Sequence, residues 1–183
     1  MIHFIVVIGP SAAGKSTIKN RLGYSTVTTW TSRLPREGEK HGIDYFFATQ
    51  EEMLKRMASG FFLEMTEYDG NYYATSLQSL ESIVLKKETV TLAVDLHGIE
   101  ELKRHFGDQV FALGLYISKE SCRVRLEERN EGGVEERLKN YEDEIMGVLA
   151  HSDLIINNEK ERWERIPLLL DGIRAMVKDS MKE

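Results

Sequence analysis

The chain has 183 residues, enough for one domain with a substantial buried core. Its formal net charge of −6 excludes a broad nucleic-acid-binding surface, so any anion must be met by local clusters of Lys and Arg. The single cysteine, Cys122, excludes an intrachain disulfide and a cysteine-based zinc site, and its apolar neighbours predict a packed thiol.

The first predicted strand, 4–8, is a continuous apolar run rich in β-branched residues, as a strand buried on both faces requires. The residues around it lack the basic region and cleavage site of a signal peptide, and no apolar run could span a bilayer. We therefore expect a cytoplasmic protein without membrane or nucleic-acid partners. A helix is predicted from about 14 to 22, and the Thr-rich segment 25–30 predicts a second strand.

The pattern of predicted elements changes after residue 30. Short strand-like segments and two short helices there predict an inserted lobe over about residues 31–87. The later segments alternate strands with helices, which is typical of a parallel α/β sheet flanked by helices. We expect strands at 89–94, 109–117 and 154–156, and helices around 99–106, 119–129 and 134–150, with a helical tail that Pro167 kinks or restarts. The chain is thus predicted to be a single domain, 1–183, with a core of about 1–30, 88–122 and 138–183 and a short lid of about 123–137.

Residues 9–17, "GPSAAGKST", match the pattern G-x-x-x-x-G-K-S/T and are called the phosphate loop below. The glycines let the backbone turn tightly, so that N–H groups and the start of the next helix face phosphate oxygens. Lys15 is expected to reach the β- and γ-phosphates of a nucleoside triphosphate, and Ser16 to bind Mg²⁺. The predicted ATP contacts in this loop are Gly9, Pro10, Ser11, Ala12, Ala13, Gly14, Lys15, Ser16 and Thr17.

A second anion site is suggested by "TSRLPREGEKHGIDYFF", where Arg33 and Arg36 flank a proline and Tyr45 follows. Two guanidinium groups and a phenol can hold one dianionic phosphate. The spacing alone fits equally well with arginines exposed on a loop, so the residues by themselves leave both interpretations open.

The order of these motifs, followed by "GFFLEMTEYDGNYYATS" and "VDLHG", resembles the guanylate kinase family over essentially the whole chain. The resemblance implies a P-loop-type α/β fold and the reaction ATP + GMP to ADP + GDP, with Mg²⁺ and with dGMP as an open alternative acceptor. By position it implies GMP phosphate contacts at Arg33, Arg36, Tyr45 and Tyr73, and guanine contacts at Thr29, Glu64, Thr75 and Asp95. It also implies that Arg125, Arg129 and Arg137 act with Lys15 on the transferring group, and that Asn157 lies beside the adenine of ATP.

Several positions depart from the family pattern. Ala93 stands where an acidic residue is usual, His97 stands where Gln is common, and a proline pair near 118–119 is absent. The lid is a few residues short. These differences bear on donor-base preference and turnover more than on the acceptor.

Other interpretations remain open at this stage. The arginines at 125 and 129 also fit the ordinary charged face of a helix, and strand alternation alone would turn Glu64 toward solvent. A peptide-binding guanylate-kinase-like domain would be expected to have a degraded phosphate loop, whereas this loop is intact. A small-metabolite kinase such as ribose bisphosphokinase would not need the guanine contacts. The sequence fits either a monomer or a homodimer.

Overall fold

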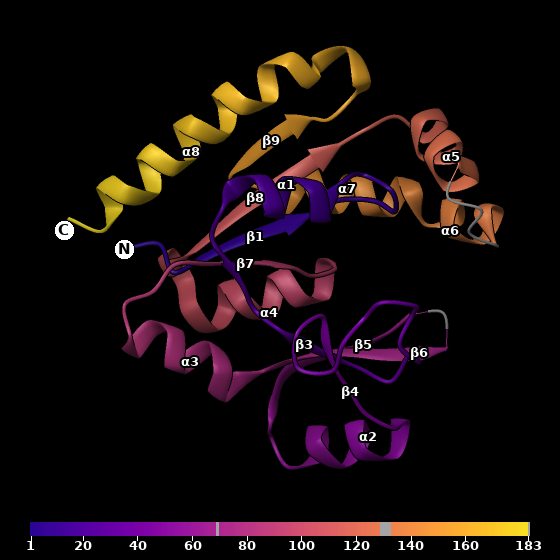
Figure 1. Ribbon diagram of the computed structural model, residues 1–183, viewed down its shortest axis with the longest axis vertical. Helices are drawn as coiled ribbons and strands as arrows, with labels where there is room; N and C mark the ends of the chain where they lie inside the picture. The colour runs from indigo at the N-terminus through magenta and orange to yellow at the C-terminus, as the bar shows by residue number, and fades with distance from the viewer. Residues whose placement is uncertain (69, 129–132, 183) are drawn as a thin grey trace.

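The main sheet of the computed structural model, which describes residues 1–68, 70–128 and 133–182, is parallel throughout. Its strands are β1 (Phe4–Ile8), β2 (Ser25–Thr26), β7 (Val90–Ala93), β8 (Val110–Tyr116) and β9 (Leu154–Asn157). They run in the order β2-β7-β1-β8-β9, so β1 lies at the centre between β7 and β8. This confirms the predicted α/β class with a parallel sheet flanked by helices (Figure 1).

Both faces of this sheet are covered, which explains the uninterrupted apolar character of β1. Ile5 and Val7 belong to a buried cluster with residues of α1 (Lys15–Leu22) and α8 (Ile166–Ser180). Phe4, Val6 and Ile8 belong to a second buried cluster with residues of α3 (Leu77–Leu85) and α4 (Leu96–Phe106). The molecule therefore has helices above and below a buried sheet (Figure 1).

A second, smaller sheet lies to one side of the main one (Figure 1). It runs in the order β4 (Tyr45–Phe47), β3 (Thr29–Thr31), β6 (Asn71–Ser76) and β5 (Phe62–Tyr68), and α2 (Gln50–Ala58) packs on it. Its core contains Met53, Phe62 and Ala74, against which Trp30 packs. The predicted single strand 25–30 is wrong, because β2 pairs with β7 of the main sheet while β3 pairs with β4 and β6.

The helices after β8 also differ from expectation. The segment predicted as one helix over 134–150 is two helices, α6 (Val134–Lys139) and α7 (Tyr141–His151), separated at Asn140. They follow α5 (Lys119–Glu128). The tail contains η2 (Lys160–Arg165), and α8 follows with Pro167 in its first turn. Proline is tolerated there, because the N–H groups of the first turn have no hydrogen-bond partner within the helix. Of the two expected effects of Pro167, a kink or a restart of the helical tail, the structure shows the restart. A short turn, η1 (Gly107–Gln109), joins α4 to β8.

The division into core, inserted lobe and lid stays a proposal. Leu80 and Ile83 of α3 share a buried cluster with Phe4 and Val90, although the expected lobe boundary at 87 places α3 in the lobe.

Cys122 is fully buried, and its Sγ lies 3.2 Å from the Ser11 carbonyl oxygen. Burial raises the pKa of its thiol to about 11, so it is a packed thiol. In the described part of the chain, no helix combines the length and the apolar character needed to cross a bilayer.

Candidate functional site

The phosphate loop connects β1 to α1. Gly14 adopts a φ of 92°, which favours glycine, and a Cβ there would lie 2.5 Å from Nδ2 of Asn158. The Lys15 ammonium folds over the loop and donates to the carbonyl oxygens of Gly9 at 2.7 Å and Pro10 at 3.0 Å. Gly14, the N-cap residue of α1, has no side chain that could cap the helix. The start of α1 can therefore face an anionic ligand.

Two side chains that are distant from this loop in sequence hold it by hydrogen bonds. Arg125 of α5 donates to the carbonyl oxygens of Ala12 at 3.2 Å and Asn158 at 2.7 Å. Asn158 is fully buried and donates to the Ala13 carbonyl oxygen at 2.7 Å. Arg125, which we expected in the lid, therefore contacts the loop itself in this state.

Asn157, the residue expected beside adenine, is exposed, and its Oδ1 accepts the Glu159 N–H at 3.1 Å. Its neighbour Asn158 makes the contact with the loop. The sequence offered no signal that separates these two adjacent asparagines, because only the fold decides which of them is buried against the loop. Arg129, another of the three predicted lid arginines, lies outside the described residues.

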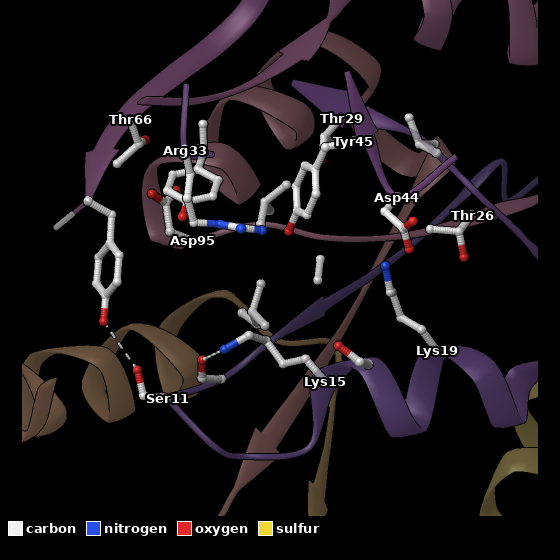
Figure 2. A pocket seen from close by; sticks show the side chains of 18 of the residues that line it. Ser11, Lys15, Lys19, Thr26, Thr29, Arg33, Asp44, Tyr45, Thr66 and Asp95 are labelled. Atoms are coloured by element: carbon white, nitrogen blue, oxygen red, sulfur yellow. Dashed lines mark hydrogen bonds between the residues drawn. The ribbon is translucent and has the colours of Figure 1, made fainter. Parts of the chain in front are cut away.

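A cavity of about 710 Å³, called the acceptor cleft below, opens between the phosphate loop and the second sheet (Figure 2). The hydroxyls of Ser11 and Tyr68 lie 3.4 Å apart across it. A smaller hollow of about 70 Å³, the base hollow, adjoins the cleft and shares several lining residues with it. The predicted residues that line one or both spaces are Gly9, Ser11, Lys15, Ser16, Thr29, Arg33, Arg36, Tyr45, Glu64, Tyr73, Thr75, Asp95 and Arg137.

One end of the cleft carries the two arginines. Arg33 donates to both carboxylate oxygens of Glu39, at 2.9 and 3.0 Å, and the backbone N–H of Arg36 donates to Glu39 at 2.7 Å. The hydrogen bond from Arg33 holds the pKa of Glu39 below its usual range. The Arg33 guanidinium carbon also lies 5.6 Å from the centre of the Tyr45 ring. Glu39, which the sequence argument missed, therefore orients Arg33 for an incoming anion.

The base hollow contains a buried carboxylate. Glu64 of β5 is 5% exposed and accepts a hydrogen bond of 2.5 Å from the hydroxyl of Thr75, its partner on β6. Burial above all, with a contribution from nearby Asp95, raises the pKa of Glu64 to about 7 against the lowering effect of the Thr75 hydrogen bond. The alternative that Glu64 faces solvent is thus wrong. A carboxylate buried at this cost is characteristic of a binding site.

Two further carboxylates lie near the boundary of the cleft. Asp95 caps α4 by accepting the Gly98 N–H at 2.8 Å, and it lines both spaces. Glu144 of α7 lines the cleft, and its Oε2 is buried without a hydrogen-bond partner in the described part of the structure. Burial raises the pKa of Glu144, while Lys15 lowers it. Glu144 gives no distinct signal in the sequence, because a run of acidic residues at a helix start is common.

Comparisons with known proteins point to one family. A family model described as guanylate kinase matches residues 1–162. A guanylate kinase of Fusobacterium nucleatum is 38% identical over 178 residues, covering 92% of this chain and 96% of the relative. One from Schizosaccharomyces pombe is 36% identical over 172 residues, covering 86% of this chain and 84% of the relative. The crystal structure of guanylate kinase from Anaplasma phagocytophilum superposes with a TM-score of 0.77 and 26% identity, over 100% of this chain and 87% of that one.

Proposed function

The chain belongs to the guanylate kinase family, and we propose that it transfers the γ-phosphate of ATP to the phosphate of GMP within the acceptor cleft. It is an ATP-dependent nucleoside monophosphate kinase, and the products are ADP and GDP. The observation that carries the residue assignment is the buried Glu64–Thr75 pair in the base hollow, which adjoins the cleft lined by Arg33 and Lys15. The hollow and the cleft together thus offer a site for a guanine, a site for its phosphate and a site for a second phosphate chain.

The donor binds at the phosphate loop, residues 9–17. Lys15 is already close to the loop backbone, and a bound triphosphate would replace the carbonyl oxygens of Gly9 and Pro10 with more strongly charged acceptors. Arg125 and Asn158 support the loop by holding the carbonyl groups of Ala12 and Ala13. Asn157, exposed at the end of β9, remains the proposed contact for the adenine.

The acceptor binds across the second sheet. Arg33 and Arg36, with Tyr45 and Tyr73, hold the GMP phosphate, and Glu39 fixes Arg33 so that little ordering is needed on binding. At the other end, the ionised Glu64 accepts hydrogen bonds from the N1–H and 2-amino groups of guanine. Thr29, Thr75 and Asp95 complete this end of the site as proposed guanine contacts.

The transfer itself needs charge compensation more than proton transfer. An oxygen of the GMP phosphate, already ionised, forms the new bond to the γ-phosphorus while the bond to the ADP oxygen breaks, so no general base is required. Lys15 of the phosphate loop and Arg137 of α6 both line the cleft. We assign Lys15, Arg129 and Arg137 to stabilising the transferring group, and Arg125 to the same task through the phosphate loop that it holds.

The residues present fit Mg²⁺ bound mainly through the substrate phosphates. In the part of the chain that the structure describes, no group of three or more His, Cys, Asp or Glu side chains is arranged to hold a metal. Mg²⁺ commonly uses one or two protein oxygens and keeps several waters, and Ser16 of the phosphate loop can supply one such oxygen. When bound, the ion neutralises charge on the phosphates.

Glu144 supports this proposal from α7. Ala93 offers no carboxylate at the family's usual acidic position, whereas the buried, unpartnered Oε2 of Glu144 lines the same cleft. We propose that Glu144 accepts a hydrogen bond from a water of the ion. A cytoplasmic location and a monomeric or homodimeric state are further proposals, and the chemistry above depends on neither.

The assignment of Lys15 can be tested with steady-state kinetics on ATP and GMP in the presence of Mg²⁺. Lys15→Ala should reduce the rate of GDP formation by roughly three orders of magnitude, as expected when a key charge on the γ-phosphate is lost. Lys55→Ala, on the exposed face of α2, is the matched control and should keep the parental rate. If Lys15→Ala stayed within about tenfold of the parent, the phosphate loop would not be the donor site.

A further inference from the structure

Thr66 places a buried hydroxyl beside the acceptor cleft that none of the assignments above uses. Its Oγ1 is inaccessible to solvent and has no hydrogen-bond partner in the described part of the structure. The residue lines both the acceptor cleft and the base hollow. Figure 2 shows Thr66 on the side of the cleft formed by the second sheet, across from Ser11 and Lys15.

The position of Thr66 along β5 relates it to the guanine site. Thr66 pairs with Tyr73 of β6, and Glu64 pairs with Thr75 of the same strand. Because side chains two residues apart share one face of a strand, Glu64 and Thr66 both face the base hollow, about 7 Å apart along the strand. Thr66 therefore lies one step from the carboxylate, in the direction of Tyr73.

A hydroxyl in this environment needs a partner. Buried polar side-chain atoms in proteins are nearly always hydrogen-bonded, and each exception calls for an explanation such as a ligand that is absent. A valine would fill the same volume without leaving a polar group unpaired. Packing therefore does not explain why this residue carries a hydroxyl, whereas a hydrogen bond to a bound substrate would.

On the basis of the proposed function, we propose that Thr66 is a further acceptor-binding residue whose hydroxyl donates a hydrogen bond to N7 of guanine. Glu64 meets the edge of the base that carries its donors, N1–H and the 2-amino group. The acceptor N7 lies on the opposite side of the bicyclic ring, and one two-residue step along a strand is comparable to the width of a purine. A threonine hydroxyl can donate to N7, which would satisfy both groups.

The test is direct measurement of nucleotide binding by calorimetry on the parent, Thr66→Val and the matched control Thr66→Ser. Thr66→Val should weaken GMP binding about tenfold, because the lost hydrogen bond leaves N7 without its partner, and should leave ATP binding unchanged. Thr66→Ser keeps the hydroxyl and should stay within about threefold of the parent. Thermal unfolding without nucleotide should show Thr66→Val to be at least as stable as the parent, since the unpaired hydroxyl is removed.

Two analogues identify the atom that Thr66 contacts. The loss caused by Thr66→Val should persist with dGMP, which retains N7, and should disappear with 7-deaza-GMP, in which a C–H group replaces N7. Parental GMP affinity in Thr66→Val, the same loss with 7-deaza-GMP, or disappearance of the loss with dGMP would each overturn the proposal. If the parent itself failed to bind GMP, the proposed function would be at fault instead, so the two failures are distinguishable.

Discussion

Glu64 should make GMP binding depend on pH in a way that its glutamine variant does not share. In the empty protein, burial raises the pKa of Glu64 from 4.5 to about 7. The two donors of guanine require the ionised carboxylate, so binding must remove the proton that Glu64 carries at lower pH. GMP affinity should therefore rise with pH until Glu64 is fully ionised.

The magnitude follows from the ionised fraction. At pH 8 nearly all molecules carry an ionised Glu64, whereas at pH 5.5 only about one in thirty does. Lowering the pH from 8 to 5.5 should therefore weaken GMP binding about 30-fold through the protonation of Glu64 alone. At pH 7 about half a proton should be released from Glu64 for each GMP bound.

Calorimetry in two buffers of different ionisation enthalpy measures this proton release. The phosphate of GMP also titrates, with a pKa near 6, so the parent alone would mix two effects. Glu64→Gln retains the titration of the phosphate and removes that of the side chain, which makes the difference between the two proteins specific to Glu64. Glu64→Gln should also bind GMP at least tenfold more weakly at pH 8, because one acceptor becomes a donor.

The same pKa shift predicts a stability difference with a defined sign. Between pH 4.5 and about 7 the folded protein holds a proton that the unfolded chain releases, so the free energy of unfolding should fall as pH rises through this window. The full shift corresponds to about 3 kcal/mol, and Glu64→Gln should remove that part of the slope. Identical pH dependence of GMP binding and of unfolding in the parent and in Glu64→Gln would refute this reasoning.

Three further substitutions test other parts of the site. Arg137→Ala should lower kcat by about 10²-fold or more with little change in the KM for GMP, and a change in KM alone would make Arg137 a binding contact instead. Arg125→Ala should weaken ATP binding and lower the thermal unfolding temperature, because Ala12 and Asn158 lose their donor; an effect on kcat alone would argue for a lid role. Gly14→Ala should destabilise the fold by about 1–3 kcal/mol and weaken ATP binding, since its Cβ would lie 2.5 Å from Nδ2 of Asn158; unaltered unfolding and binding would contradict the observed loop geometry.

The sequence was sufficient for the features that depend on local pattern. The continuous apolar run of β1 and the glycines of the phosphate loop predict a buried strand and an anion site because each is determined by its own residues. The two arginines of the cleft were also found, although their spacing alone did not decide between a clamp and an exposed loop. Glu39 shows what such spacing leaves out, since it becomes a partner of Arg33 only once the loop has folded.

Other features depend on contacts that a pattern does not encode. The Thr-rich segment 25–30 favours strand structure but carries no information about which sheet each half joins. The apolar stripe through Leu138 and Tyr141 continues on one face across the break at Asn140, so periodicity predicts a single helix there. Alternation on β5 could not distinguish a solvent-facing Glu64 from a buried one, because the space that it faces is closed by Asp95, which is distant in sequence.

The central claim is that this chain phosphorylates GMP and selects it by its guanine, and one acceptor panel tests it most directly. Purified protein with ATP and Mg²⁺ would be offered GMP, dGMP, AMP, CMP and UMP, with diphosphate formation followed for each. We expect GDP to form with a kcat/KM for GMP on the order of 10⁴-fold above that for AMP, and this preference to narrow in Glu64→Gln. Comparable rates with AMP or a pyrimidine nucleotide, or no diphosphate from GMP, would contradict the account.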